Sequence, residues 1–153
     1  MLCIGGIVVQ DFKDRAVYWV LFPLLGSLLF VINILKSSEN EIVILSVLLN
    51  LLLVATILFL VFLYTKIVLK RKFIDYSLGL GDVLFFIAMA LGFPTVTFLT
   101  LYVHALLFSF LFFLAIKKKL KEPTIPLAGL MGIYLIIVLG YSIFFDEPQL
   151  YLL

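Results

Sequence analysis

Long apolar runs separated by short charged loops constrain this chain more than any other feature of its sequence. Of its 153 residues, 65% are hydrophobic and the mean hydropathy is +1.32, whereas a soluble domain is about half apolar. Several runs approach or exceed the roughly 20 apolar residues of a membrane-spanning helix, and they lack the alternation of a membrane barrel. The sequence predicts an all-α polytopic membrane protein, a single domain over 1–153, with about six transmembrane segments: 2–10, 17–35, 42–64, 83–92, 96–116 and 127–145.

The first and fourth of these segments are short. At about 1.5 Å per residue the first would not cross about 30 Å of hydrocarbon, so we expect it to penetrate part way or to start upstream of Met1. Gly92 and Pro94 stop the fourth segment. No basic region precedes the first segment, which argues against a cleaved signal peptide. Tyr18 and Trp19 open the second segment and suit a membrane interface.

Basic residues gather in alternate loops. If the segments cross the membrane in turn, the loops at 11–15, 65–82 and 117–123 share one side, and the other side has only Lys36. The positive-inside rule then places these loops in the cytoplasm and both termini outside the plasma (inner) membrane. We interpret 117–121 as a topology anchor that also touches anionic lipid. The shared side holds ten of the eleven basic residues: Lys13, Arg15, Lys66, Lys70, Arg71, Lys72, Lys117, Lys118, Lys119 and Lys121.

Two aspartates on that side, Asp11 and Asp82, each border a short apolar segment and could meet at a similar depth. Two carboxylates that share a site cannot both ionise cheaply, so one keeps a proton while the other stays charged. The ionised one can take a proton from water, and the protonated one can polarise a peptide carbonyl. Such a pair suffices for peptide hydrolysis without a nucleophilic Ser or Cys. A partly desolvated membrane boundary would raise both pKa values and help keep the pair monoprotonated.

Asp82 is flanked by Gly79 and Gly81, which would let the backbone adopt positive φ and let an extended substrate approach closely. The alternative is structural, because an Asp directly before an apolar helix is a favoured N-cap and Gly-Leu-Gly is an ordinary loop entry. For Asp11 the alternative is a solvated charge beside two basic residues. The residue pattern by itself leaves both interpretations of Asp82 open.

Three stretches carry a family resemblance. GLGDVLFFIAMALG (79–92) resembles the GxGDxKLLxAxG motif of the type IV prepilin peptidases and archaeal preflagellin peptidases, which are GxGD membrane aspartyl proteases. QDFKDRAVYWVLFPLL (10–25) resembles the other signature of that family, an Asp four residues before a basic residue and then an apolar-Pro turn into the next span. TIPLAGLMG (124–132) resembles the Ile-Pro-rich entry to the last helix. The three occur in the family's order and cover most of the chain.

This resemblance implies specific roles for four residues. Asp11 and Asp82 match the two catalytic aspartates of the family, and Gly79 and Gly81 match its motif glycines. The family's activity requires no metal and no cofactor, and we expect none here.

The chain also departs from the family pattern. Leu84 stands where the motif has Lys, and Tyr18 stands where the first signature usually has Pro. These changes bear on substrate choice more than on the acid pair. The chain lacks the cysteine-bearing cytoplasmic insert of many bacterial members, so we expect no methyltransferase activity.

Other polar residues have structural interpretations. Asp14 lies one helical turn from Asp11 and could share its face, but we interpret it and Asp75 as solvated loop charges. Asn33 and Asn50 are expected to make interhelical contacts.

His104 lies within the fifth segment, without a second His or a Cys motif for a metal site, and we expect a buried hydrogen-bonding residue. Cys3 is the only cysteine, so no intrachain disulfide forms. A nucleic-acid partner would need a basic face outside the membrane, and little of the chain lies there.

The sequence therefore predicts a membrane-embedded aspartyl endopeptidase that cleaves leader peptides from type IV prepilin-like precursors at the cytoplasmic face. Its partners would be pilin-like precursors with a hydrophobic N-terminal helix, and the lipid bilayer. The alternative is a non-enzymatic membrane assembly or transport protein in which Asp82 is a helix cap. A presenilin-type protease also has a GxGD acid, but its first Asp usually follows Tyr inside a long helix, and Gln10-Asp11 does not match that.

Overall fold

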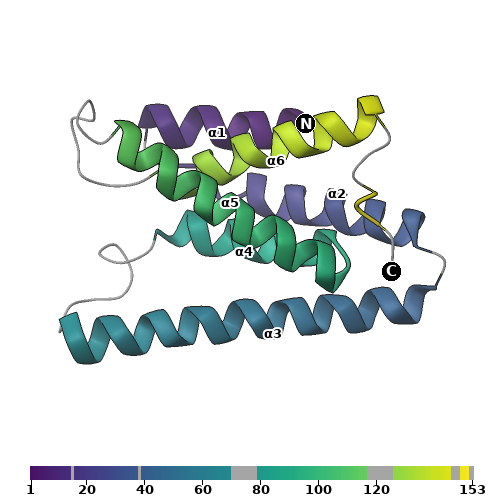
Figure 1. Cartoon of the computed structure of the whole chain (residues 1–153), viewed down its shortest axis with the longest axis horizontal. Helices are drawn as coiled ribbons and strands as arrows, with labels where there is room; N and C mark the ends of the chain where they lie inside the picture. The colour runs from purple at the N-terminus through teal and green to yellow at the C-terminus, as the bar shows by residue number, and fades with distance from the viewer. Residues whose placement is uncertain (15, 38, 70–78, 117–125, 146–148, 152–153) are drawn as a thin grey trace.

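The computed structural model describes residues 1–14, 16–37, 39–69, 79–116, 126–145 and 149–151, and this described part is helical and contains no strand (Figure 1). Segment η1 (Thr65–Leu69) is a π-helical continuation of α3 (Asn40–Tyr64). Each of the six predicted segments has its helix, which confirms the all-α class. The elements are α1 (Leu2–Asp14), α2 (Leu21–Lys36), α3 (Asn40–Tyr64), η1 (Thr65–Leu69), α4 (Leu80–Gly92), α5 (Thr95–Ile116) and α6 (Leu127–Phe145).

Within the described residues, three stretches are long and apolar enough to cross a membrane: Glu41–Ile67 in α3 and η1, Thr95–Ala115 in α5 and Leu127–Phe145 in α6. Helices α2 and α4 are shorter and also apolar. Large hydrophobic side chains cover the outer surface too; Leu52 on α3 is 64% exposed. Water would not favour such a surface, but lipid would, and the fold fits an all-α membrane protein.

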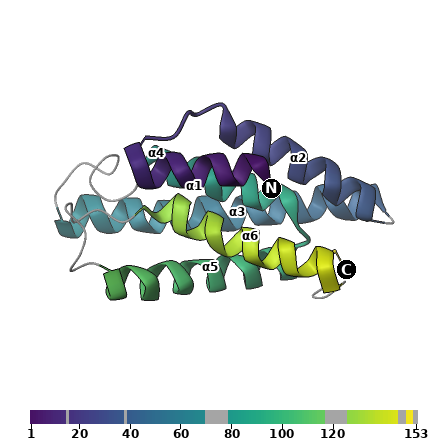
Figure 2. The same ribbon diagram turned by 90° about the horizontal axis from the view of Figure 1, so that it is seen from above.

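The helices pack mainly in pairs. Helix α2 lies against α4 and α1 against α6, while α5 contacts α6 and α3 contacts α4 (Figures 1 and 2). Glycines allow close approach: a Cβ at Gly92 would lie 2.8 Å from Cβ of Leu29, and one at Gly132 would lie 2.9 Å from Cγ2 of Val8. This pairing brings the end of α1, the start of α4 and the start of α6 toward one end of the bundle (Figure 1).

Helices α1 and α4 each extend about one turn beyond the predicted bounds, and each added turn carries an aspartate. Helix α1 continues to Asp14, so Asp11 lies inside it, and α4 begins at Leu80, so Asp82 is its third residue. Hydropathy indicates which residues are buried, so the predicted segments end where the apolar residues end. A helix ends where its backbone hydrogen bonds end, and charged residues can belong to it. Both carboxylates therefore stand on helices.

Helix α2 begins at Leu21, four residues later than the predicted start of the segment. The residues before it form a turn in which the Leu21 N–H donates to the Tyr18 carbonyl at 3.0 Å. The Tyr18 N–H in turn donates to Oε1 of Gln10 at 3.0 Å, which ties this turn to α1. The side chains of Tyr18 and Trp19 are exposed, as expected for residues of a membrane interface.

Helix α4 ends in the interior of the bundle, where its last carbonyls need donors. Nδ2 of Asn50 donates to the carbonyls of Ala90 at 3.1 Å and Phe93 at 2.9 Å, and Nδ2 of Asn33 donates to the Leu91 carbonyl at 3.4 Å. Phe93 is completely buried, so water does not supply these bonds. The predicted interhelical role of both asparagines is confirmed.

The predicted burial of His104 is wrong. Its side chain is exposed on α5, and Nδ1 lies 2.8 Å from the carbonyl oxygen of Thr100, one turn earlier. Helix α5 is apolar on all sides, so its sequence does not reveal which face packs inward. A bond within the same helix satisfies the ring nitrogen without a partner helix.

Candidate active site

The first turn of α6 connects the two predicted catalytic residues. The N–H of Gly129 donates to Oδ2 of Asp11 at 2.6 Å, and the N–H of Ala128 donates to Oδ1 of Asp82 at 2.8 Å. Asp11 comes from α1 and Asp82 from α4, so the site joins three helices that are far apart in the sequence. Because the two donors belong to successive residues, the two carboxylates lie side by side at this helix end.

The donors are available because they begin a helix. The first N–H groups of an α-helix have no acceptor within the helix, and the helix dipole makes this end positive. In α6 the first intrahelical bond runs from the Leu130 N–H to the Pro126 carbonyl at 3.0 Å. The N–H groups of Ala128 and Gly129 precede it and turn to the aspartates instead. A helix N-terminus is a favourable place for negative charge.

Asp82 also closes the start of its own helix. Its Oδ2 accepts a hydrogen bond from the N–H of Gly79 at 3.2 Å, and its N–H donates to the Gly79 carbonyl at 3.1 Å. Gly79 is therefore the N-cap residue, and Asp82 is the third helical residue, in the position of the acid in a capping box. The predicted N-cap position of Asp82 is wrong by three residues, although its carboxylate does cap α4.

The motif glycines matter because they have no side chain. Gly79 has φ −70°, and neither motif glycine has the positive φ that the sequence suggested. A Cβ at Gly79 would lie 3.2 Å from Oδ2 of Asp82, and one at Gly81 would lie 3.3 Å from Cζ of Phe22. The first glycine leaves room for the carboxylate, and the second lets α4 approach α2 closely.

Gly129 leaves room for the other carboxylate. A Cβ at this position would lie 2.9 Å from Oδ2 of Asp11 and 3.1 Å from the nearest ring carbons of Phe12. Real Cβ atoms essentially never approach another atom to 2.9 Å, so only glycine fits while Asp11 keeps this bond. The sequence shows this residue within the third stretch, TIPLAGLMG, but predicts no role for it.

The surroundings of Asp82 favour its protonated form. The side chain is half-buried, and desolvation raises the pKa of Asp82 to about 6. The hydrogen bond from Ala128 opposes this shift, the negative charge of Asp11 adds to it, and the bond from Gly79 opposes it weakly. The charge of Asp11 acts on Asp82 because both carboxylates accept bonds from successive amides of α6. Near pH 6 Asp82 can therefore hold a proton beside the charge of Asp11.

The remaining predicted residues contribute less to this site. Leu84, in place of the motif Lys, packs against the apolar core. The side chain of Asp14 and the whole of Asp75 lie outside the described residues, as does the basic run at 117–121. Within the described part of the chain, no three His, Cys, Asp or Glu side chains gather as metal ligands.

Residue patterns miss the two donors from α6. A backbone N–H exists at every residue except proline, so no side chain marks Ala128 or Gly129 as part of a site. The sequence indicates the site only through Pro126 at a helix start and the small residues Ala128 and Gly129 just after it, which let another segment approach.

Comparisons of the chain with protein-family models, with curated proteins and with solved structures found no match. The relationship to the prepilin peptidases therefore stays a prediction from the three motif stretches.

Proposed function

We propose that this protein is a membrane-embedded aspartyl endopeptidase of the prepilin-peptidase type, with Asp11 and Asp82 as its catalytic pair. The observation that carries the proposal is the pair of hydrogen bonds from Ala128 and Gly129, which hold the two carboxylates on adjacent amides. The raised pKa of Asp82 supports it, because a working pair needs one protonated member.

The reaction needs only the two acids and water. The ionised carboxylate takes a proton from a water molecule, whose oxygen attacks the peptide carbonyl carbon, while the protonated carboxyl donates its hydrogen to the carbonyl oxygen. The tetrahedral intermediate then collapses, the C–N bond breaks, and one acid protonates the leaving amine. The amides of Ala128 and Gly129 keep both carboxylates in position during this exchange.

The substrate class follows from the setting and from the motif resemblance. A precursor with a hydrophobic N-terminal helix could lie in the bilayer beside the enzyme and present its leader junction at the end of the bundle that bears the aspartates. The distribution of basic residues in the sequence predicts that this end faces the cytoplasm. Pilin-like precursors have this architecture.

Cleavage of co-expressed candidate precursors, followed as leader loss by mass spectrometry, tests the proposal. We expect Asp11→Asn and Asp82→Asn each to reduce cleavage below detection, because general acid–base catalysis contributes about 10²–10⁴-fold for each group. Asp14→Asn and Asp75→Asn are the matched controls and should retain activity. Full activity in either the Asp11 or the Asp82 variant would exclude this pair as the catalytic machinery.

A second function is favoured by the bond from Gly79 to Asp82. If Asp82 serves only to cap α4, the protein is a non-enzymatic membrane assembly or transport component. Asparagine keeps a side-chain oxygen that can accept the bond from the Gly79 N–H, but it cannot exchange a proton. Asp82→Asn therefore separates the two functions: the cap function survives this change, and the peptidase activity does not.

A further inference from the structure

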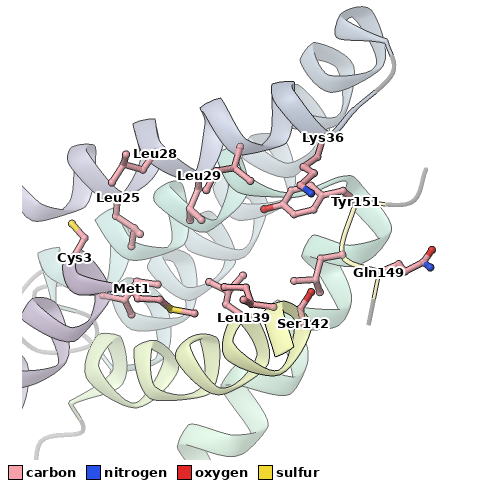
Figure 3. A pocket seen from close by; sticks show the side chains of 14 residues that line it. Met1, Cys3, Leu25, Leu28, Leu29, Lys36, Leu139, Ser142, Gln149 and Tyr151 are labelled. Atoms are coloured by element: carbon pink, nitrogen blue, oxygen red, sulfur yellow. The ribbon is translucent and has the colours of Figure 1, made fainter. Parts of the chain in front are cut away.

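An apolar groove of about 940 Å³ is formed by the start of α1, α2 from Leu25 to Lys36, the last turns of α6 and residues 149–151 (Figure 3). These elements meet at the end of the bundle opposite the end of α1 and the start of α4, which carry the aspartates (Figure 1). The rim residues Leu28, Ile32 and Ile143 are 50%, 40% and 69% exposed, so the groove opens sideways from the bundle. In a membrane protein this opening faces lipid.

The groove has one polar end. Lys36, Ser142, Gln149 and Tyr151 gather there, whereas the side chains of Leu25 and its neighbours line the remainder (Figure 3). Lys36 is the last residue of α2 and is exposed. It is also the only basic residue that the charge pattern assigns to this side of the membrane. The positive-inside rule therefore does not explain why a lysine stands here.

The size of the groove can be compared with the size of its possible occupants. An α-helix is about 10 Å across, so a space of this size would take a stretch of only about eight residues. If each chain carbon takes roughly the 30 Å³ that one water molecule takes in the liquid, the two acyl chains of a phospholipid fill roughly 1,000 Å³. A groove in the hydrocarbon region does not fill with water, because its lining offers too few polar partners. Lipid chains are therefore the fitting occupant.

We propose that this groove binds an anionic phospholipid, with its acyl chains along the apolar lining and its headgroup phosphate on the Lys36 ammonium. Chains gain little by leaving the bilayer for an equally apolar groove, so the headgroup contact sets the selectivity. An exposed ion pair between one lysine and one phosphate contributes up to about 1 kcal/mol, which favours binding by up to about fivefold. The proposal does not depend on the peptidase activity.

A single tryptophan placed at the rim reports the occupant. Trp19→Phe removes the only tryptophan, and Leu28→Trp then places one at the groove, with Ile32→Trp as a second position if the first variant does not fold. The matched control is Leu52→Trp on the lipid-facing surface of α3. Fluorescence quenching is measured in vesicles in which either phosphatidylglycerol or phosphatidylethanolamine has brominated chains, after circular dichroism confirms the helical content.

We expect phosphatidylglycerol to be preferred at the groove up to about fivefold more strongly than at the control position. Lys36→Gln should remove this excess, Lys36→Arg should keep it, and Lys66→Gln, at the other end of α3, should leave it unchanged. Equal lipid preference at the groove and control positions would overturn the proposal. An excess that persists in Lys36→Gln would overturn the assigned role of Lys36.

Discussion

Asp82 has the bonds of a helix cap and the surroundings of a reactive acid. A cap needs only its hydrogen bond, which favours the ionised form and lowers the pKa. Asp82 has such a bond from Gly79, yet its half-burial and the charge of Asp11 raise its pKa to about 6. A residue serving only as a cap gains nothing from a second acid beside it. A carboxylate held in an unfavourable place is typical of a functional site.

The raised pKa of Asp82 makes stability depend on pH. Its folded pKa of about 6 exceeds the ordinary value of 3.8, so the folded protein keeps a proton that the unfolded chain has released. The contribution of Asp82 to the free energy of unfolding is fully present below about pH 4. It decreases by about 3 kcal/mol as the pH rises through about 6. We expect Asp82→Asn to lack this component, so the variant should gain stability relative to the original protein between pH 4 and 8. Thermal unfolding in detergent, followed by circular dichroism, measures the difference.

Asp11→Asn is the partner experiment. Without the charge of Asp11, the folded pKa of Asp82 should decrease, so the pH-dependent loss of stability should end at lower pH and be smaller. If the pH profile of Asp11→Asn matches that of the original protein, the two carboxylates do not interact.

At the residue scale, the two aspartates paired from the sequence accept bonds from neighbouring amides, but the sequence did not predict these backbone donors. Asp11, Asp82 and the two motif glycines could be identified because a rare acid among apolar residues stands out. The donors at Ala128 and Gly129 could not, since only the position of α6 makes them part of the site. The positive φ expected for the motif glycines was wrong because their role is to leave room for neighbouring groups.

At the element scale, the first turn of α6 is the part that joins α1 to α4. We expect Gly129→Ala to reduce cleavage by about 10²-fold or more. The added Cβ would lie only 2.9 Å from Oδ2 of Asp11 and would push this carboxylate out of position. Precursor cleavage and helical content are measured together. Gly140→Ala in the same helix, where a Cβ meets nothing within 4 Å, should behave like the original protein. Equal activity in both variants would show that the amide of Gly129 does not position Asp11.

The far end of α4 depends on Asn50 in a different way. Asn50→Leu keeps the size of the side chain but removes the donor to the carbonyls of Ala90 and Phe93. Leaving such groups unsatisfied costs about 1–3 kcal/mol, so the unfolding temperature in detergent should decrease by several degrees. Thr56→Val on the same helix removes an exposed hydroxyl bonded to Leu52 and should change little. A similar loss in both variants would count against the role of Asn50.

Which elements exist could be predicted, but their ends could not. Hydropathy located each helix because burial in lipid requires apolar side chains. The ends of α1, α2 and α4 differ from prediction because they depend on hydrogen bonds, such as that from Tyr18 to Gln10, between residues that the pattern treats separately. Those differences matter, since they place both aspartates on helices.

At the scale of the whole molecule, charge and geometry can be compared. Lys66 follows the end of α3, and Lys36 ends α2 just before α3 begins, so the length of α3 separates them. Helix α3 has 25 residues and, at about 1.5 Å per residue, this is enough to cross a bilayer. We therefore expect the two lysines to lie on opposite sides of the membrane. The end of α1 and the start of α4, which carry the aspartates, lie toward the end of α3 that η1 continues (Figure 1).

This separation allows a direct test of orientation. In a Cys3→Ser background, which removes the only thiol, Lys36→Cys and Lys66→Cys each introduce one exposed cysteine. The distribution of basic residues predicts that a membrane-impermeant maleimide labels position 36 in intact cells and position 66 only after permeabilisation. The reverse result would put the carboxylates of Asp11 and Asp82 outside the cell. A leader peptide that stays in the cytoplasm would then be out of reach, so this outcome would exclude cytoplasmic cleavage even if both acids proved essential.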